Sequence, residues 1–458
     1  IADSHTSAKY IIFPAKWIVF HCFHKQIIKI TMHTEHQRVT WRHHTNVYEI
    51  NLRQYTEEGT FNAFAGELPR LRKMGVETLW FMPVTPIAKE KMKGTMGSYY
   101  ACSDYTSINP EFGTLDDFKK LIHLAHQLGF KVIIDWVANH TGWDHVWTKT
   151  HPEYYKRDEA GNFKAASGMD DIIELDFNNP DLVKAMIDAM AFWIKECDID
   201  GFRCDLAFWV ELDFWRKSRP VLDQIKPLFW LGEFDALDNP AYLEVFDAAY
   251  AWTWMHKTEE FYKNQRHIPL LESLLQQYTS VFLPGTTGLY FTSNHDENSW
   301  NGTEFEKYGD MAPALAVFSC TWDGIPLIYS GQELPTLKRL KFFDKDVIEW
   351  DGKYALEDFY RKLLTLRTEN PALASGDGKT KTTILDFKQD DHIFGYTRKS
   401  GNNAVLVLLN LSPYPSRFMN KDTGITGKCK ELFSNEEKDC SANQWFELAA
   451  WGYKVYVK

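Results

Sequence analysis

The sequence lacks a surplus of positive charge. Its 51 lysine and arginine residues are outnumbered by 62 aspartate and glutamate residues, and the formal net charge is −11 at pH 7. Proteins that bind polyanions as their main partners usually present a basic surface. The composition therefore argues against nucleic acid or an anionic membrane as the main partner, and it favours a neutral ligand.

Clustered cysteines are also absent. The seven cysteines are scattered, and none stands at the spacing of a metal site; they are Cys22, Cys102, Cys197, Cys204, Cys320, Cys429 and Cys440. Neither a disulfide framework nor a zinc site is indicated. We therefore expect a reducing compartment, the cytoplasm.

No long hydrophobic run is present near the start of the sequence. The apolar patch Ile11–Phe20 is interrupted at Lys16, well short of the roughly 18 uninterrupted apolar residues that a spanning helix needs. No small-residue cleavage site follows the patch, which argues against a secretory signal. Because Met32 precedes a polar lead-in to the first strand, we hypothesise that residues 1–31 are translated upstream sequence or a disordered extension, and we assign 1–46 to an N-terminal extension.

Strand and helix patterns alternate regularly from Val47 onward. Aromatic residues make up 15% of the 458-residue chain, so a large core is available. Eight short apolar runs are typical of strands: Val47–Leu52, Thr78–Met82, Lys131–Val137, Gly201–Cys204, Leu228–Leu231, Ala248–Tyr250, Leu289–Phe291 and Pro326–Tyr329. Helical spacing lies between or after them, for example over Leu115–Leu128, Asp181–Lys195, Met311–Thr321 and Leu356–Arg367.

This alternation predicts an α/β fold, a (β/α)₈ TIM barrel over residues 47–375. A stretch of more than 40 residues with little periodicity follows the third strand. Connections of that length in a compact domain are usually functional, so we expect a short inserted subdomain at about 140–178. After Gly376 the pattern changes to strands, which predicts a C-terminal all-β sandwich domain over 376–458.

Four acidic residues stand at the ends of predicted strands, where a barrel of this kind places its chemistry. They are Asp135, Asp205, Glu233 and Asp296. A single acid after a strand is as often a helix cap or a buried structural acid. Four together, with Arg203 and His295 close to two of them, indicate acid–base and nucleophilic chemistry on an acetal.

The neighbours of these acids suggest different roles. Arg203 lies two residues from Asp205 and should keep that carboxylate ionised, as a nucleophile requires. Glu233 follows Phe229 and Trp230. If those rings exclude water, the pKa of Glu233 rises and the group can donate a proton to a leaving group.

At this point the sequence resembles the α-amylase family, glycoside hydrolase family 13. Its ordered segments are Asp135-Trp-Val-Ala-Asn-His140, Gly201-Phe-Arg-Cys-Asp205, the Glu233 segment and Phe291-Thr-Ser-Asn-His-Asp296. Further matches are the Gly97–Tyr105 segment, Glu174–Asn178 and Gly324–Glu333. The resemblance extends from about Val47 to the C-terminus and implies a retaining enzyme that acts on α-glucosidic bonds.

The resemblance also implies individual roles. Asp205 would be the nucleophile, Glu233 the general acid/base and Asp296 the third acid, which holds the distorted sugar by its hydroxyls. The residues that match the family's substrate contacts are Tyr100, His140, Arg203 and His295, and Asp135 would orient Arg203 from behind. Each of the two histidines could instead be an ordinary hydrogen-bonded core residue, and Tyr100 could be core packing.

Two features qualify the resemblance. Phe208 and Trp209 occupy positions where the family often has Lys-His, so a lysine contact to the reducing-end sugar is missing and acceptor specificity is open. The family's calcium site uses side chains that match Asn139 and Asp176, oxygen ligands suited to a hard cation. Calcium is therefore a possible cofactor, and the alternative is that both residues simply hydrogen-bond the inserted loop.

Three functions are consistent with the residues. The leading hypothesis is an α-amylase-type hydrolase acting on starch-like glucans or maltooligosaccharides. An α-glucanotransferase would pass the same intermediate to a sugar acceptor, and a non-catalytic carbohydrate-binding relative would have lost the chemistry. Trp143 and Trp147 either stack on outer sugar units or belong to the packing of the inserted loop.

Overall fold

The computed structural model describes residues 38–166, 168–264, 267–352, 354–387 and 392–458. The hypothesis about residues 1–31, and most of the predicted extension 1–46, concern residues outside these ranges.

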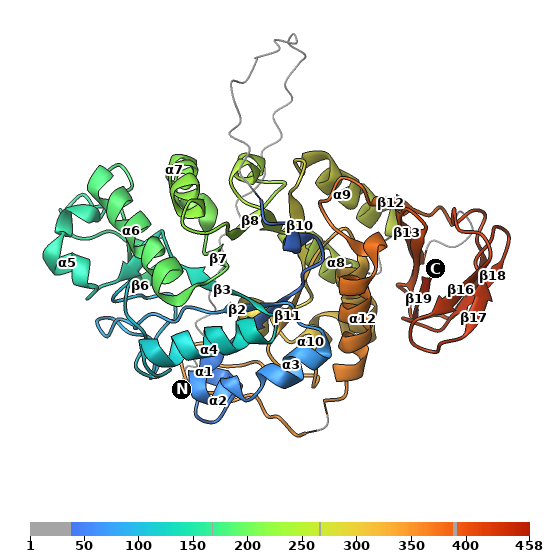
Figure 1. The fold of residues 1–458 in the computed structure, drawn as a ribbon, viewed down its shortest axis with the longest axis horizontal. Coiled ribbons are helices and arrows are strands. Elements are labelled where there is room, and N and C mark those ends of the chain that lie inside the picture. Colours follow the sequence, from blue (N-terminus) through green and yellow to red (C-terminus); the bar gives the residue numbers. More distant parts are fainter. Residues whose placement is uncertain (1–37, 167, 265–266, 353, 388–391) are drawn as a thin grey trace, which may run out of the picture. The chain divides into compact units, whose positions relative to one another are not determined.

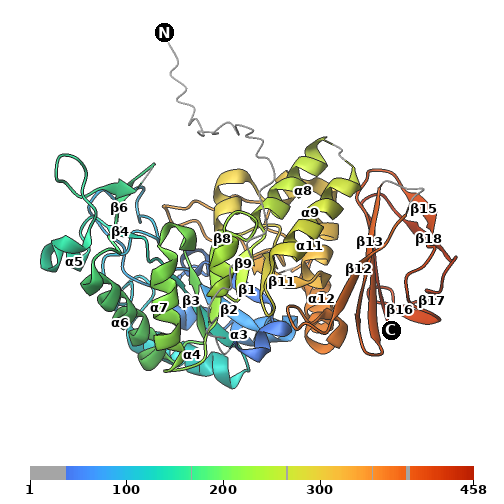
Figure 2. The same cartoon turned by 90° about the horizontal axis from the view of Figure 1, so that it is seen from above.

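Eight parallel strands close into a barrel, which confirms the predicted (β/α)₈ fold (Figures 1 and 2). The last strand pairs back onto the first, so the sheet has no open edge. The barrel strands are β1 (Val47–Ile50), β2 (Thr78–Phe81), β3 (Lys131–Trp136), β7 (Gly201–Cys204), β8 (Phe229–Asp235), β9 (Ala248–Tyr250), β10 (Thr287–Tyr290) and β11 (Gly324–Tyr329). Each overlaps one of the strands that the sequence pattern predicts.

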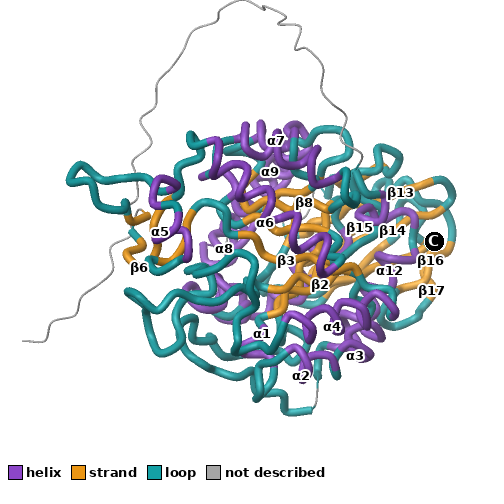
Figure 3. The backbone as a smooth tube through the Cα atoms, turned by 60° about the vertical axis from the view of Figure 1, so that its left-hand side comes forward, coloured by secondary structure: helices purple, strands orange, loops and turns teal. Residues whose placement is uncertain are grey.

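Helices surround the barrel, and Figure 3 shows them in purple outside the orange strands. They are α1 (Leu52–Tyr55), α2 (Phe61–Ala65), α3 (Leu68–Met74), α4 (Leu115–Gln127), α6 (Pro180–Cys197), α7 (Leu212–Asp223), α8 (Trp252–Asn264), α9 (Ile268–Val281), α10 (Glu304–Tyr308), α11 (Ala312–Thr321) and α12 (Glu357–Glu369). The sequence marks their starts locally. Thr114 and Asp117 form a capping box at α4, and the Asn179 side chain caps α6.

Side chains fill the interior of the barrel. Trp80, Ile133, Leu231, Leu289 and Leu327 come from five different strands and form one buried cluster. The interior is a packed core rather than a channel. Polar groups on the strands can therefore contact a ligand only near the strand ends. The predicted acids stand at the carboxyl ends.

The long connection after β3 contains a small sheet, as the fold prediction requires. Its strands are β4 (His140–Gly142), β5 (Ala165–Ala166) and β6 (Met169–Glu174), in the order β4-β6-β5, and the short helix α5 (Val146–Thr150) accompanies them. Since β4 begins only four residues after β3 ends, the subdomain starts at the carboxyl end of the barrel.

The C-terminal part is all β, as predicted. It has a six-stranded and a two-stranded sheet, in the orders β12-β13-β14-β19-β16-β17 and β15-β18. The strands are β12 (Lys381–Ile384), β13 (Ile393–Ser400), β14 (Asn403–Asn410), β15 (Ser416–Met419), β16 (Lys428–Glu431), β17 (Glu437–Asp439), β18 (Trp445–Leu448) and β19 (Tyr453–Val457). A buried hydrogen bond of 2.6 Å between the hydroxyls of Thr321 and Tyr396 joins this part to the barrel.

Residues 38–46, the described part of the predicted extension, contact the amino ends of barrel strands. The Arg38 guanidinium donates to Asp247 at 2.6 Å, and that of Arg42 donates to the carbonyl of Gly285 at 2.9 Å. Asp247 directly precedes β9, and Gly285 lies shortly before β10. This segment therefore lies at the end of the barrel opposite the predicted acids. Among the described helices, none is both long and apolar enough to cross a membrane.

Candidate active site

The four predicted acids come together at the carboxyl end of the barrel. Asp135 and Glu233 lie within β3 and β8, Asp205 directly follows β7, and Asp296 follows β10. The side chains of Asp205 and Glu233 are 9% and 8% exposed, whereas that of Asp296 is 39% exposed. Asp296 therefore lies closest to solvent.

Arg203 of β7 connects three of these acids. Its guanidinium is fully buried and lies 2.9 Å from Asp135, 3.0 Å from Asp205 and 2.8 Å from Glu233, measured from nitrogen to oxygen. Its Nε also donates to the Tyr250 hydroxyl at 3.1 Å. A planar fork with five donors suits this arrangement, which a lysine could not reproduce. Asp135 is thus placed to orient the arginine, the role that the family resemblance implies for it.

The electrostatics of Asp205 differ from the sequence argument. Burial and the neighbouring Glu233 carboxylate raise the pKa of Asp205 well above its ordinary value, although Arg203 acts in the opposite direction. Glu233 forms an ion pair with Arg203 at 2.8 Å and accepts a hydrogen bond from the backbone N–H of Leu206 at 2.9 Å. Arg203 therefore does not single out Asp205 as the ionised acid, contrary to the sequence argument, because the same guanidinium also lies against Asp135 and Glu233.

His295 and Tyr100 form the wall beside Asp296. The His295 Nε2 lies 2.8 Å from the Tyr100 hydroxyl and 3.3 Å from the Asp296 carboxylate, and the two rings are stacked with centroids 5.3 Å apart. The Tyr100 hydroxyl also donates to Asp135 at 3.0 Å. Burial raises the pKa of Asp296, but the charge and the hydrogen bond of His295, together with the charge of Arg203, outweigh this effect and leave the pKa below its ordinary value.

His140 lies at the start of the inserted subdomain. Its side chain is buried, and burial lowers its pKa to about 4, so the ring is neutral at pH 7. Its Nδ1 lies 3.2 Å from the Asn139 amide, and its Nε2 has no hydrogen-bond partner among the described residues. An unpartnered buried nitrogen of this kind is available to a ligand.

The proposed calcium ligands lie on paired backbone segments. The N–H of Leu175 donates to the Asn139 carbonyl at 3.0 Å, which places Asp176 next to Asn139 along that pairing. The Asp176 carboxylate accepts from the N–H and the side-chain amide of Asn178, at 3.1 and 2.8 Å. The donors suit calcium in kind, but this ion takes six to eight oxygens. Within the described residues, no cluster of three or more His, Cys, Asp or Glu residues could hold a metal ion.

Two tryptophans of the inserted subdomain already have partners. The Lys91 ammonium lies 3.1 Å above the centre of the Trp143 ring, and the Trp147 ring packs between Tyr105 and Tyr154 at 5.0 and 5.4 Å. These contacts favour packing of the inserted loop over sugar stacking for Trp147. Phe208, in contrast, is 38% exposed three residues after Asp205.

Sequence reasoning missed two residues of the cluster. Glu49 of β1 accepts a hydrogen bond from His295, and Tyr250 of β9 bonds Arg203. Both stand in short apolar strands, Val-Tyr-Glu-Ile and Ala-Ala-Tyr. The signal for Glu49 was present, since an acid inside a buried strand must have a polar partner. The signal for Tyr250 was absent, since tyrosine is common in strands.

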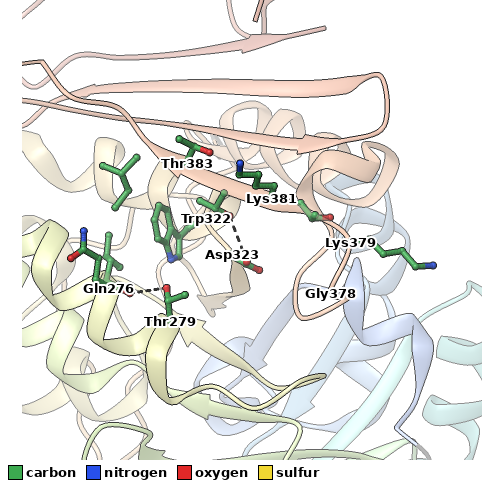
Figure 4. Close-up of a pocket in the computed structure, with 12 residues that line it drawn as sticks. Gln276, Thr279, Trp322, Asp323, Gly378, Lys379, Lys381 and Thr383 are labelled. Atoms are coloured by element: carbon green, nitrogen blue, oxygen red, sulfur yellow. Dashed lines mark hydrogen bonds between the residues drawn. The ribbon is translucent and has the colours of Figure 1, made fainter. Parts of the chain in front are cut away.

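A separate cavity of about 820 Å³ lies away from this cluster, between α9, Trp322 and the start of the C-terminal domain. Figure 4 shows Trp322 between Thr279 of α9 and Thr383 of β12. The hydroxyls of Thr279 and Thr382 bond to Leu275 and Asp323. None of the predicted site residues lines the cavity, and Asp323 directly precedes β11, so it belongs to the amino end of the barrel.

Comparison with known proteins matches the part of the chain that carries this cluster to a known domain. The family model described as alpha amylase, catalytic domain, matches residues 34–168 and 156–362. The α-amylase MalA of Haloarcula japonica is 27% identical over 398 residues, covering 82% of this chain but only 56% of the relative. A maltogenic α-amylase of Bacillus acidopullulyticus is 26% identical over 440 residues, covering 86% of this chain and 71% of the relative.

A solved structure agrees over nearly the whole chain. The noncanonic maltogenic α-amylase AmyB from Thermotoga neapolitana superposes with a TM-score of 0.83 at 28% identity, covering 91% of this chain and 99% of that protein. The barrel and the C-terminal β domain are therefore shared as one arrangement.

Proposed function

Because the chain belongs to the α-amylase family, glycoside hydrolase family 13, we propose that it hydrolyses α-1,4-glucosidic bonds in starch-like glucans or maltooligosaccharides with retention of configuration. The observation that carries this proposal is the convergence of Asp205 and Glu233 on Arg203 at the carboxyl end of the barrel, with the Asp296 carboxylate close enough to act on Asp205 through its charge. The net negative charge of the chain agrees with a neutral substrate rather than a nucleic acid.

The proposed reaction is a double displacement. Glu233 protonates the glycosidic oxygen while Asp205 attacks the anomeric carbon and forms a covalent glycosyl intermediate. Glu233 then removes a proton from water, which attacks the same carbon and releases Asp205. One guanidinium contacts both carboxyl groups, which supports the short separation of about 5 Å that a retaining enzyme needs.

The remaining residues would bind the reacting sugar. Asp296 would hold its hydroxyls, with His295 and the unpartnered Nε2 of His140 as further hydrogen-bond partners. Arg203 would position Asp205, and the Tyr100 ring would stack on the sugar face. Neutral His140 can accept or donate, which suits a hydroxyl group.

Replacing Glu233 by glutamine tests this assignment. We expect starch hydrolysis, measured as reducing ends, to fall by about 10²–10⁴-fold because a general acid is lost. Activity on an α-maltosyl fluoride should fall far less, since fluoride leaves without protonation. Unchanged starch hydrolysis in the variant would refute the role of Glu233. No hydrolysis by the unmodified protein would favour the alternative, a non-catalytic carbohydrate-binding protein.

Transfer to a sugar acceptor is the second candidate. The exposed ring of Phe208, three residues after Asp205, offers an apolar face near the site where the family often has a charged lysine. Chromatography of the early products from maltotetraose separates the two activities. Glucose, maltose and maltotriose alone indicate hydrolysis, whereas oligosaccharides longer than maltotetraose indicate transfer.

Calcium binding and a cytoplasmic location remain predictions. Asn139 and Asp176 would supply a side-chain oxygen each, and calcium would lock the start of the inserted subdomain against the residues that lead into α6. The cytoplasmic prediction rests on the scattered cysteines, and those within the described ranges are buried and free. Fractionation of the native cells tests it.

A further inference from the structure

Trp300 is a large aromatic residue that remains exposed beside the acid cluster. It lies in the π-helical turn Glu297–Asn301, which begins directly after Asp296, and it is 48% exposed. Its side chain lies beside the Asp296 carboxylate and helps to lower the pKa of that group. Trp300 therefore stands at the edge of the site, next to the acid that would hold the reacting sugar.

Aromatic rings connect Trp300 to the interior of the site. The Phe342 ring lies 5.4 Å from that of Trp300, and it is stacked on Tyr100 at 6.2 Å with an angle of 16° between the planes. Phe343 lies 5.7 Å from Trp300 on the same segment. The rings form a continuous series from solvent to Tyr100, which bonds His295.

Three segments that carry these rings are held together by hydrogen bonds. Asn298 of the π-helical turn donates to the Lys338 carbonyl at 3.1 Å and accepts from the Leu340 N–H at 2.8 Å. The carbonyl of Phe343 accepts from the Met96 N–H at 3.0 Å, which links it to the loop before Tyr100. The rings are therefore in place before any ligand arrives, and ordering them upon binding costs little entropy.

Two charged side chains next to this surface already have hydrogen-bond partners. Arg339 donates to Glu306 at 2.9 Å, and Asp344 accepts from the Thr95 hydroxyl at 2.7 Å. An exposed, preformed aromatic surface suits the apolar C–H face of a pyranose ring.

We propose that Trp300 and Phe342 form a sugar-binding shelf that holds a pyranose unit next to the one that reacts at the three acids. This inference rests on the proposed function and adds to it a preference for chains of at least three glucose units. Because the turn that carries Trp300 begins directly after Asp296, the shelf adjoins the acid that would hold the reacting sugar.

The test measures binding in a Glu233→Gln background, where the ligand is not consumed. Calorimetric titration with maltose, maltotriose and maltotetraose should show tighter binding of the longer chains. Trp300→Ala should weaken maltotetraose binding by about tenfold and remove most of that length preference. Trp300→Phe keeps the ring without the N–H and should retain most of the affinity.

Trp445→Ala is the matched control, because that tryptophan is 49% exposed on the C-terminal domain. It should leave all three affinities unchanged. If the Glu233→Gln protein binds maltotetraose and Trp300→Ala binds it equally well, the shelf is refuted while the proposed function stands. If Trp300→Phe is as weak as Trp300→Ala, only the N–H matters and stacking is refuted. If the Glu233→Gln protein, folded by circular dichroism, binds none of the sugars, both proposals fail.

Discussion

The Glu49 Oε1 of the first barrel strand lies 2.5 Å from the His295 Nδ1, across 246 positions of sequence. Both side chains are buried, and the second oxygen of Glu49 has no partner among the described residues. Burial alone would lower the pKa of His295, but the carboxylates of Asp296 and Glu49 raise it well above its ordinary value. The pair therefore keeps the imidazole charged, so that Nε2 can donate toward Asp296 and a sugar hydroxyl.

Glu49→Gln should shift the alkaline limb of the pH profile. Removing this negative charge lowers the pKa of His295, so the ring loses its proton at a lower pH and activity falls earlier as pH rises. The measurement is kcat/KM on maltotetraose between pH 5 and 10. Other titratable or charged groups around the His295–Glu49 pair also influence the pH profile; they are Tyr100, Asp135, Arg203, Tyr250, Asp296 and Tyr329.

Glu333→Gln is a suitable comparison for Glu49→Gln. Glu333 is an equally buried acid after β11, but it bonds Tyr48 and Arg70 rather than a histidine. Its replacement should lower the melting temperature and leave the alkaline limb in place. A profile of Glu49→Gln that overlays that of Glu333→Gln would show that Glu49 is only structural.

Arg203→Lys should reduce kcat on starch by at least about 100-fold. A lysine cannot contact Asp135, Asp205 and Glu233 at once, so buried carboxylates lose partners and the nucleophile loses its position. Arg219→Lys changes another fully buried arginine, which bonds Asp247 and Asp223 outside the cluster. Both variants should unfold at lower temperature, but only Arg203→Lys should lose kcat in the folded protein. Equal kcat values would contradict the positioning role.

Asp200→Asn should remove stability that depends on pH. Burial raises the pKa of Asp200, but His126, Lys226 and the Val132 N–H outweigh it and hold the pKa at about 2. A depressed pKa stabilises the fold above the ordinary value near 4, by about 2 kcal/mol, and this contribution disappears as pH falls from about 4 toward 2. The difference in melting temperature from the unmodified protein should therefore be largest at pH 7, roughly halved near pH 3 and smallest at pH 2 or below.

Asp213→Asn provides the control for that series, since Asp213 is a 73% exposed acid paired with Arg216 on the surface. Surface pairs of this kind contribute little. Its melting temperature should follow that of the unmodified protein at every pH. A pH-independent loss in Asp200→Asn would contradict the proposed ionic cause.

Added calcium should raise the melting temperature if Asn139 and Asp176 bind it. Scanning calorimetry with EDTA and with millimolar calcium measures the shift, and Asp176→Ala should abolish it. Asp158→Ala is the control, because Asp158 is an acid in the same subdomain that caps its own turn through Ala160 and Asn162. No shift in the unmodified protein would refute calcium binding at these residues.

Much of the fold was predictable because its signals are local. Alternating apolar runs identified all eight barrel strands, and Asp135, Asp205 and Glu233 follow from standing at or just after strand ends. Parallel strands of a closed barrel bring their carboxyl ends to one rim. The role of Arg203 was misjudged because sequence proximity to Asp205 hid its equally close contact with Glu233.

The sequence by itself determined which residues face the core, where the strands end, and that acids gather at one rim, since periodicity records burial along a single chain. Only the tertiary structure decided the partners across the barrel. Glu49 contacts His295 because β1 pairs with β11 and closes the barrel. Trp300 contacts Phe342 because a hydrogen bond from Asn298 to the Lys338 carbonyl joins their two loops. Such contacts depend on barrel closure and loop packing, for which no local pattern exists.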